Sequence, residues 1–247
     1  MIIMPMAGVR RRFTLAGYKV PKYMLEARGK SLFQHAVESF EQYFNQIPFL
    51  FIARNINETD VFIKKNCEKM GIKNYEIVML DAPTRGQAET VMLGVEKATL
   101  SPETSLTIFN IDTFRPNFSF PQEFDLNEID GYLEVFIGSG ANWSYVKPIK
   151  PDSQQVAETA EKREISQFCC TGLYHFSQLK DFKKAFDDYS QMSQECWEGQ
   201  ELYIAPMYNN LIAQGGKIVY HLINSEDVIF CGTPTEYEAF KALFESE

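Results

Sequence analysis

Three consecutive arginines, Arg10, Arg11 and Arg12, stand close to the amino terminus, and Lys22 follows them. Guanidinium and ammonium groups bind phosphate, and the preceding Gly8 lets backbone N–H groups approach an anion closely. The apolar run 1–7 has no polar face, which is typical of a strand buried on both sides. Because open α/β sheets bind ligands at the carboxyl ends of their strands, these residues predict a site for a phosphate chain. The alternative interpretation is an ordinary first strand followed by a solvated basic turn.

Asp112 is a candidate metal ligand. It comes directly after the apolar run 106–111, so its carboxylate is expected at the same edge of the sheet as Gly8. Mg²⁺ commonly uses one or two carboxylates together with substrate phosphates. An Asp that follows a strand is also a common helix cap or turn former, and position alone leaves both interpretations open.

The elements that must position these residues alternate between strands and helices throughout the first half. Apolar runs predict the strands, and apolar residues at helical spacing predict the helices, the first capped by Ser31 and the second ended by Gly71. From Gly131 the runs are short and separated by Gly, Pro, Asn and Ser, which is typical of a mixed or antiparallel portion. The pattern predicts an α/β fold with three α/β/α layers, in which the sheet is mostly parallel with a mixed second half. The expected strands are 48–53, 75–80, 105–111, 132–137, 143–146, 155–159, 168–176 and 217–223, and the expected helices are 32–44, 58–70, 86–98, 178–189, 201–214 and 235–244.

Composition excludes several classes of protein. The 247 residues suit one domain, 1–247, with halves 1–130 and 131–247. A net charge of −9 argues against a general nucleic-acid binder, because such proteins need a broad cationic surface. With no leader and no apolar run of membrane-spanning length, a cytoplasmic protein without a membrane partner is expected. The five cysteines are odd in number and lack zinc-type spacing, which favours buried filler roles over disulfides or a metal site.

The first half resembles the nucleotidyltransferases that activate sugar phosphates and related small phosphates. In that family the first strand leads into a Gly-x-Gly-x-Arg loop and then a Pro-Lys, which Gly8, Arg12 and Pro21-Lys22 match. The segment 82–90 looks like the loop and helix start with which these enzymes read the nucleobase. There the Gln87 amide offers both a donor and an acceptor to a base edge.

The second half resembles the acceptor side of the same enzymes. Trp143 and its neighbours, then Glu161-Lys162, then Gly172 in a Gly-x-Tyr strand appear in the expected order. In the family the Glu-Lys pair supplies a cation for the acceptor phosphate. Relatives with an added acyltransferase or β-helical tail are longer, so the resemblance implies the minimal catalytic type of NDP-sugar pyrophosphorylase.

Two positions depart from the family pattern. Arg10 stands where the loop usually has its second glycine, and Phe230 stands two residues before Gly232, where many relatives have a second metal-binding Asp. Either Asp227 or Glu226 substitutes for that Asp, or the second carboxylate is absent. The resemblance implies catalytic roles for Arg12 and Lys22, nucleotide binding by Ala7, Gly8, Arg10, Arg11, Gly86 and Gln87, acceptor binding by Trp143, Glu161, Lys162 and Gly172, and metal binding by Asp112 and Asp227.

The implied function is transfer of a nucleotidyl group with Mg²⁺ as cofactor. The partners would be a nucleoside triphosphate and a phosphorylated small-molecule acceptor, with a sugar 1-phosphate expected, and the products pyrophosphate and a nucleotide-activated precursor for polysaccharide biosynthesis. One alternative is a nucleotide-sugar-dependent glycosyltransferase, which would need an acidic pair where Asn110-Ile111-Asp112 has one acid. The other is a nucleotide-sugar-binding protein without catalysis. The sequence names neither the nucleobase nor the acceptor.

Overall fold

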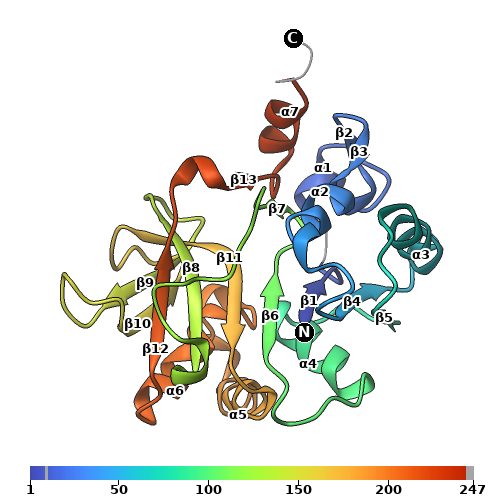
Figure 1. Ribbon diagram of the computed structural model, residues 1–247. Coiled ribbons are helices and arrows are strands. Elements are labelled where there is room, and N and C mark those ends of the chain that lie inside the picture. Colours follow the sequence, from blue (N-terminus) through green and yellow to red (C-terminus); the bar gives the residue numbers. More distant parts are fainter. Residues whose placement is uncertain (9–10, 243–247) are drawn as a thin grey trace.

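One large mixed sheet runs through both halves of the chain. The computed structural model describes residues 1–8 and 11–242 (Figure 1). Within these residues the sheet has nine strands in the order β10-β9-β11-β6-β1-β4-β5, with β8 beside β11 and β12 beside β8. The strands are β1 (Ile2–Pro5), β4 (Phe49–Arg54), β5 (Tyr75–Leu80), β6 (Leu106–Phe109), β8 (Gly131–Ile137), β9 (Ser144–Pro148), β10 (Val156–Glu161), β11 (Phe168–Phe176) and β12 (Ile218–Leu222).

The two halves contribute different kinds of pairing. β1, β4, β5 and β6 of the first half are parallel to one another. β11 then runs antiparallel to β6, β8 and β9, and only β12 and β8 pair in parallel among the described strands of the second half. The expected α/β sheet with a mixed second half is confirmed.

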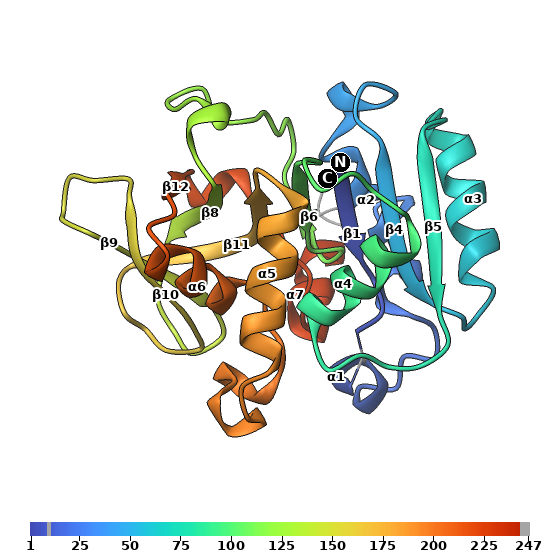
Figure 2. The ribbon, with the colours of Figure 1, turned by 90° about the horizontal axis from the view of Figure 1, so that it is seen from below.

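Helices cover both faces of this sheet, because the side chains of its strands alternate between two cores. In β1, Ile3 belongs to one hydrophobic cluster, whereas Ile2 and Met4 belong to the other. Figure 2 shows α4, α5 and α6 in front of the sheet, with α3 at its edge. The helices are α1 (Arg11–Leu15), α2 (Leu32–Glu38), α3 (Thr59–Met70), α4 (Gln87–Lys97), α5 (Leu179–Ser190), α6 (Tyr208–Ala213) and α7 (Pro234–Ala242).

Short elements complete the fold. β7 (Thr113–Phe114) pairs with β13 (Ile229–Phe230), which brings the late chain beside Asp112, and β2 (Glu26–Ala27) pairs with β3 (Lys30–Ser31). The 3-10 helices are η1 (Lys22–Met24), η2 (Glu41–Tyr43), η3 (Leu126–Glu128), η4 (Gln194–Cys196), η5 (Glu198–Gln200), η6 (Ala205–Met207) and η7 (Ser225–Asp227).

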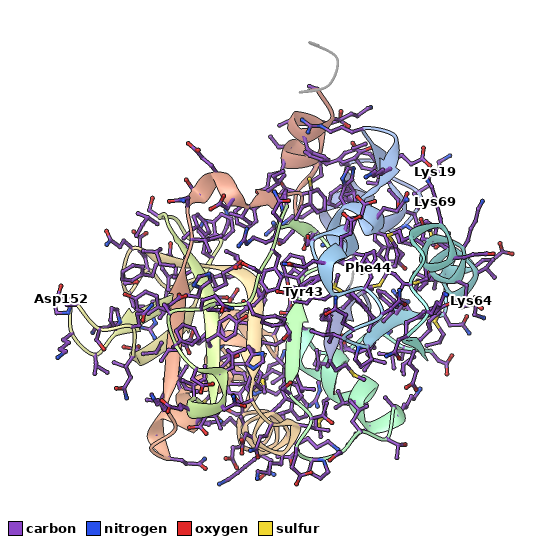
Figure 3. All side chains as sticks on the ribbon, in the orientation of Figure 1. Lys19, Tyr43, Phe44, Lys64, Lys69 and Asp152 are labelled. Carbon is purple, nitrogen blue, oxygen red and sulfur yellow. The ribbon has the colours of Figure 1, made fainter. Side chains whose placement is uncertain are left out.

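Local sequence signals explain where several elements begin and end. Ser31 forms a capping box with Gln34, whose backbone N–H donates to the Ser31 hydroxyl over 3.2 Å. Gly71 ends α3 in the left-handed conformation with φ 73°. Lys64 and Lys69, labelled in Figure 3, are exposed side chains of α3. These two termini and the strands at 75–80 and 168–176 match the sequence prediction.

Two predicted helices are wrong in extent. The helix after Ser31 ends at Glu38, and Phe40 and Phe44 reach the core from a 3-10 turn, each packing on Phe49. The helix expected over 201–214 is absent from 201–204 and begins only with η6 and α6. The reason is that Leu202 pairs with the backbone beside Gly86 instead.

Four of the five cysteines are buried, as expected for fillers, and the prediction is wrong for Cys196. Cys67, Cys169, Cys170 and Cys231 are buried and Cys196 is exposed, all as free thiols. Among the helices of the described ranges, none has the length and apolar character needed to cross a membrane.

Candidate active site

A large pocket lies at the carboxyl ends of the parallel strands. Its volume is about 740 Å³. It is lined by Met6 and Gly8 after β1, by Arg54 at the end of β4, and by Gln87 at the start of α4. The segment 194–203 of the second half closes its other side. We call it the large pocket, and its lining is Pro5, Met6, Gly8, Pro21, Lys22, Tyr23, Arg54, Ile56, Thr84, Arg85, Gly86, Gln87, Thr90, Asn110, Ile111, Asp112, Gln194, Trp197, Gln200, Glu201 and Tyr203.

A second, small pocket of about 250 Å³ adjoins the first. Gln87, Asn110, Asp112 and Tyr203 line both, so the two cavities meet at these side chains. The small pocket is lined mainly by β11, the segment 142–144 and the chain from β13 to the start of α7, with Glu161 from β10. Its other lining residues are Arg12, Thr113, Asn142, Trp143, Ser144, Glu161, Cys170, Thr171, Gly172, Tyr174, Phe230, Gly232, Thr233 and Glu236.

Lys22 and Asp112 form an ion pair where the pockets meet. Lys22 Nζ donates to Asp112 Oδ2, with side-chain exposures of 27% and 17%. β6 delivers Asp112 to the sheet edge as predicted, and the Cys231 N–H donates to the Asp112 carbonyl over 2.8 Å, which fixes the chain around it. A cation and an acid are thus held together at the sheet edge.

Gly86 and Gln87 are positioned by contacts within the chain. Gly86 has φ 156°, and a Cβ there would lie 2.5 Å from the Leu202 backbone N and O atoms. Leu202 N donates to Arg85 O over 3.0 Å and Leu202 O accepts from Ala88 N over 2.9 Å. The close approach that Gly86 allows is therefore to segment 194–203, which it holds over the large pocket. The Gln87 side-chain amide donates to Asn110 Oδ1.

Gly172 makes room for Asn110 in the small pocket. It has φ 97°, and a Cβ there would overlap the Asn110 side chain. Asn110 N also donates to Gly172 O over 3.1 Å. Gly172 thus positions the amide that Gln87 contacts.

Glu161 is a buried acid of the small pocket. Its residue is 6% exposed, and burial raises the pKa of its carboxyl to about 7. The Ser144 hydroxyl donates to it, and Lys162 Nζ lies 3.8 Å away. Such a carboxyl changes its charge near neutral pH.

Lys162 lines neither pocket. It has φ 57°, and its Nζ donates to the Tyr203 hydroxyl over 2.5 Å while lying 4.5 Å from that ring's centroid. Burial lowers the Lys162 pKa. The hydrogen bond to Tyr203 and the negative charges of Glu161 and Glu201 together have a larger effect, so the net result is a raised pKa. The ammonium group therefore stays charged and ties β10 to segment 194–203.

Comparison with solved structures identifies a family for the chain that carries these pockets. The nucleoside-diphosphate-sugar pyrophosphorylase from Vibrio cholerae RC9 is 51% identical, with a TM-score of 0.92 over 98% of this chain and 100% of that one. The chain belongs to the nucleoside-diphosphate-sugar pyrophosphorylase family. The members of this family are nucleotidyltransferases, so the chain is an enzyme of that class. No protein-family model matches the sequence, and no curated protein does.

More distant structures share the fold. A putative glucose-1-phosphate thymidylyltransferase from Bacillus anthracis is 16% identical with a TM-score of 0.73, covering 98% of this chain and 93% of that one. The inositol-1-phosphate CTP transferase from T. maritima is 15% identical with a TM-score of 0.72, covering 99% and 94%. These similarities show a shared fold.

The structure brings most residues of the predicted pyrophosphorylase site together. Gly8, Lys22, Gly86 and Gln87 line the large pocket, whereas Ala7 is buried beside it. The prediction for Arg10 lies outside the described residues, and Arg11 is described only as the start of α1. The predicted residues that line the small pocket are Arg12, Gln87, Asp112, Trp143, Glu161 and Gly172.

Asp227 is the predicted metal ligand that the structure does not bring to either pocket. Its carboxylate accepts from Asn224 Nδ2 over 3.4 Å, and its carbonyl accepts from Arg115 Nη1 over 2.7 Å. Glu236 of α7 is the second acid beside Asp112 instead. A Cβ on Gly232 would lie 3.1 Å from Asp112 Oδ2 and 3.7 Å from Glu236 Oε2. In the described part of the chain, no three His, Cys, Asp or Glu side chains form a metal-binding group by themselves.

Sequence reasoning missed Arg54 and the wall formed by segment 194–203. Arg54 ends β4 and lines the large pocket, and its buried Nε has no hydrogen-bond partner. The available sequence signal was that Arg54 stands at the end of a buried strand, where a ligand-binding residue is expected. The Arg85 guanidinium carbon lies 5.5 Å from the centroid of the Trp197 ring. No local sequence pattern indicates that contact.

Proposed function

We propose that the chain joins a nucleoside triphosphate to a phosphorylated small molecule and releases pyrophosphate, with a sugar 1-phosphate as the expected acceptor. The observation that carries this proposal is the pair of adjoining pockets that share Gln87, Asn110 and Asp112. The large pocket has the size and the cations for a triphosphate, and the small pocket is suited to a compact acceptor. A UDP-glucose pyrophosphorylase with the same fold has been solved in complex with UDP-glucose.

The reaction needs positioning and charge neutralisation rather than a covalent intermediate. An acceptor phosphate oxygen attacks the α-phosphorus in line, a new P–O bond forms, and the bond to the bridging oxygen of pyrophosphate breaks. In this proposal Lys22 moves from Asp112 to the α-phosphate. Arg12 is exposed and lines the small pocket, so its side chain would have to swing toward the large pocket to stabilise the departing pyrophosphate. Gln87 reads the base edge, and Arg54, which lines the large pocket, offers its guanidinium to the triphosphate.

The donor set at the junction of the pockets fits Mg²⁺. Asp112 and Glu236 would supply two carboxylates, and Mg²⁺ commonly takes its remaining ligands from water and substrate phosphates. Glu236 Oε2, the oxygen on the side of Gly232 and Asp112, also accepts from the Thr233 N–H over 2.8 Å, and a carboxylate oxygen that accepts one hydrogen bond keeps a lone pair for a metal. Bound there, Mg²⁺ would neutralise charge on the triphosphate oxygens. The product would be an activated precursor for polysaccharide biosynthesis, made in the cytoplasm.

Pyrophosphate release tests the proposal. The protein is mixed with Mg²⁺, each of the common nucleoside triphosphates and a panel of sugar 1-phosphates and other small phosphate esters. Release that requires both substrates supports the proposal. Release of a nucleoside diphosphate from a nucleotide sugar would support a glycosyltransferase, and binding without turnover would support a nucleotide-sugar-binding protein.

A further inference from the structure

Three aromatic side chains gather at the small pocket, and we call Phe136, Trp143 and Phe230 the aromatic cluster. Ring centroids are 4.6 Å apart for Trp143 and Phe230, 5.1 Å for Phe136 and Trp143, and 5.3 Å for Phe136 and Phe230. Phe136 is buried behind the other two, which are partly exposed and line the small pocket. The pocket therefore has an aromatic wall.

Phe230 occupies this wall because of its place in β13. It pairs with Thr113, the residue after Asp112, so an acid at this position would lie beside the predicted metal ligand. The side chain here is a ring that tilts 57° against Trp143. Position 230 thus contributes an apolar π surface to the acceptor side.

Carboxylates outnumber cations around the same cavity. Asp112, Glu161 and Glu236 line it, and Arg12 is the one cation among its described lining residues. Asp112 is paired with Lys22 and, with Glu236, is assigned to Mg²⁺ in the proposed function, so Glu161 is the carboxylate left to face an acceptor. Lys162 lies outside the lining with its ammonium on Tyr203. A phosphate ester that enters this pocket meets few cations beyond Arg12, whereas its other end meets aromatic rings and the buried Glu161.

The geometry points to an acceptor that carries an ammonium group in addition to its phosphate. This inference rests on the proposed function. Aromatic faces attract cations, quaternary ammonium groups in particular, and a carboxylate at the rim adds a charge partner. An uncharged sugar ring can also stack on aromatic side chains, so the charge of the acceptor is the property to test.

Two matched pairs of acceptors isolate that charge. Phosphocholine and 3,3-dimethylbutyl phosphate differ by a quaternary nitrogen in place of a carbon, and glucosamine 1-phosphate and glucose 1-phosphate differ by an ammonium in place of a hydroxyl. We expect the charged member of at least one pair to give a kcat/KM for pyrophosphate release at least about tenfold higher. Equal or better turnover of the uncharged member in both pairs would overturn the inference while leaving the proposed function intact.

Calorimetric titration of the same four compounds into the protein with Mg²⁺ covers the case of no turnover. Tighter binding of the charged member would support the inference even if the proposed function failed. Equal binding within both pairs, or tighter binding of the uncharged members, would contradict it.

Variants locate the effect in the aromatic cluster. Trp143→Leu and Phe230→Leu should raise KM for the preferred charged acceptor by about tenfold more than KM for its uncharged partner, whereas Trp143→Phe should keep most of the preference. Phe168→Leu is the matched control, because Phe168 pairs with Tyr220 at 4.7 Å and lines neither pocket. Loss of preference in the control alone, or in none of the variants, would remove the aromatic cluster from acceptor recognition.

Discussion

At the scale of single residues, Asp112 and Lys22 satisfy each other's charge until ligands compete for them. The ion pair holds the ammonium at the junction of the pockets, and a bound triphosphate would offer it a stronger anionic partner. Metal binding would likewise offer the carboxylate a divalent partner. Triphosphate binding would release Asp112 from Lys22, and metal binding would release Lys22 from Asp112. The ion pair therefore couples the two binding events.

Asp112→Asn should lower kcat by at least about 100-fold with Mg²⁺, because the amide removes the anionic ligand while nearly keeping its size. The melting temperature should stay close to that of the wild type. Calorimetric titration of Mn²⁺ with a triphosphate analogue should show weakened metal binding. Asp227→Asn is the matched control and should behave as wild type, since Asp227 lines neither pocket. The opposite ranking of the two variants would move the metal to η7.

Glu161 predicts a pH dependence of acceptor binding. Burial raises its pKa to about 7, with Ser144 and Lys162 opposing the shift and Glu198 and Glu201 adding to it. The carboxyl is protonated below that pKa and charged above it, so a cationic acceptor should bind better as pH rises. From about pH 6 to about pH 8, KM for phosphocholine should fall by up to about tenfold.

The phosphate group of the acceptor also titrates in this range, so 3,3-dimethylbutyl phosphate serves as the control for it. Glu161→Gln should remove the difference between the two pH profiles. A difference that persists in Glu161→Gln would assign the titration to another group.

At the scale of elements, Arg115 connects η7 to strand β8 of the sheet. Its Nε donates to Glu134 Oε1 over 2.8 Å and its Nη1 to the Asp227 carbonyl over 2.7 Å, with side-chain exposures of 8% for Arg115 and 0% for Glu134. Thr171 Oγ1 donates to the same Glu134 oxygen over 2.9 Å. This cluster joins β7, β8, β11 and η7, and so places β13 and the aromatic residue at 230.

Arg115→Met should lower the free energy of unfolding by about 3–5 kcal/mol, because it leaves the Glu134 carboxylate buried without its cation. Arg163→Met is the comparison, since the Arg163 side chain is 54% exposed and its pairs with Glu158 and Glu198 should be worth at most about 1 kcal/mol. Urea denaturation of both variants measures the difference. Equal losses would mean that the buried pair contributes no more than a surface pair.

Sequence patterns predict elements well where local signals decide them. The strand at 75–80 and the capped start of α2 follow from apolar runs and from Ser31. The helix expected from 201 is wrong because Leu202 is held by the backbone around Gly86, which lies far away in the sequence. Asp112 was predictable from its strand, whereas Glu236 looks like an ordinary capping residue of α7 and becomes an acid of the site only through tertiary packing.

At the scale of the whole molecule, the site depends on both halves of the chain. The parallel half supplies the strand ends of the large pocket, and the antiparallel half supplies β10 and β11 of the small pocket. Segment 194–203 crosses back to close the large pocket, so residues 131–247 also contribute to its lining. The net charge of −9 makes the cations near the strand ends a local feature of an acidic protein.

The central claim is that an acceptor phosphate oxygen attacks the α-phosphorus of a nucleoside triphosphate. The most direct test uses an acceptor whose terminal phosphate oxygens are labelled with ¹⁸O and reads both products by mass spectrometry. We predict a coupled product that retains all of the acceptor label, together with an equal amount of unlabelled pyrophosphate. Label in the pyrophosphate, or a nucleoside monophosphate formed without a coupled product, would contradict the account.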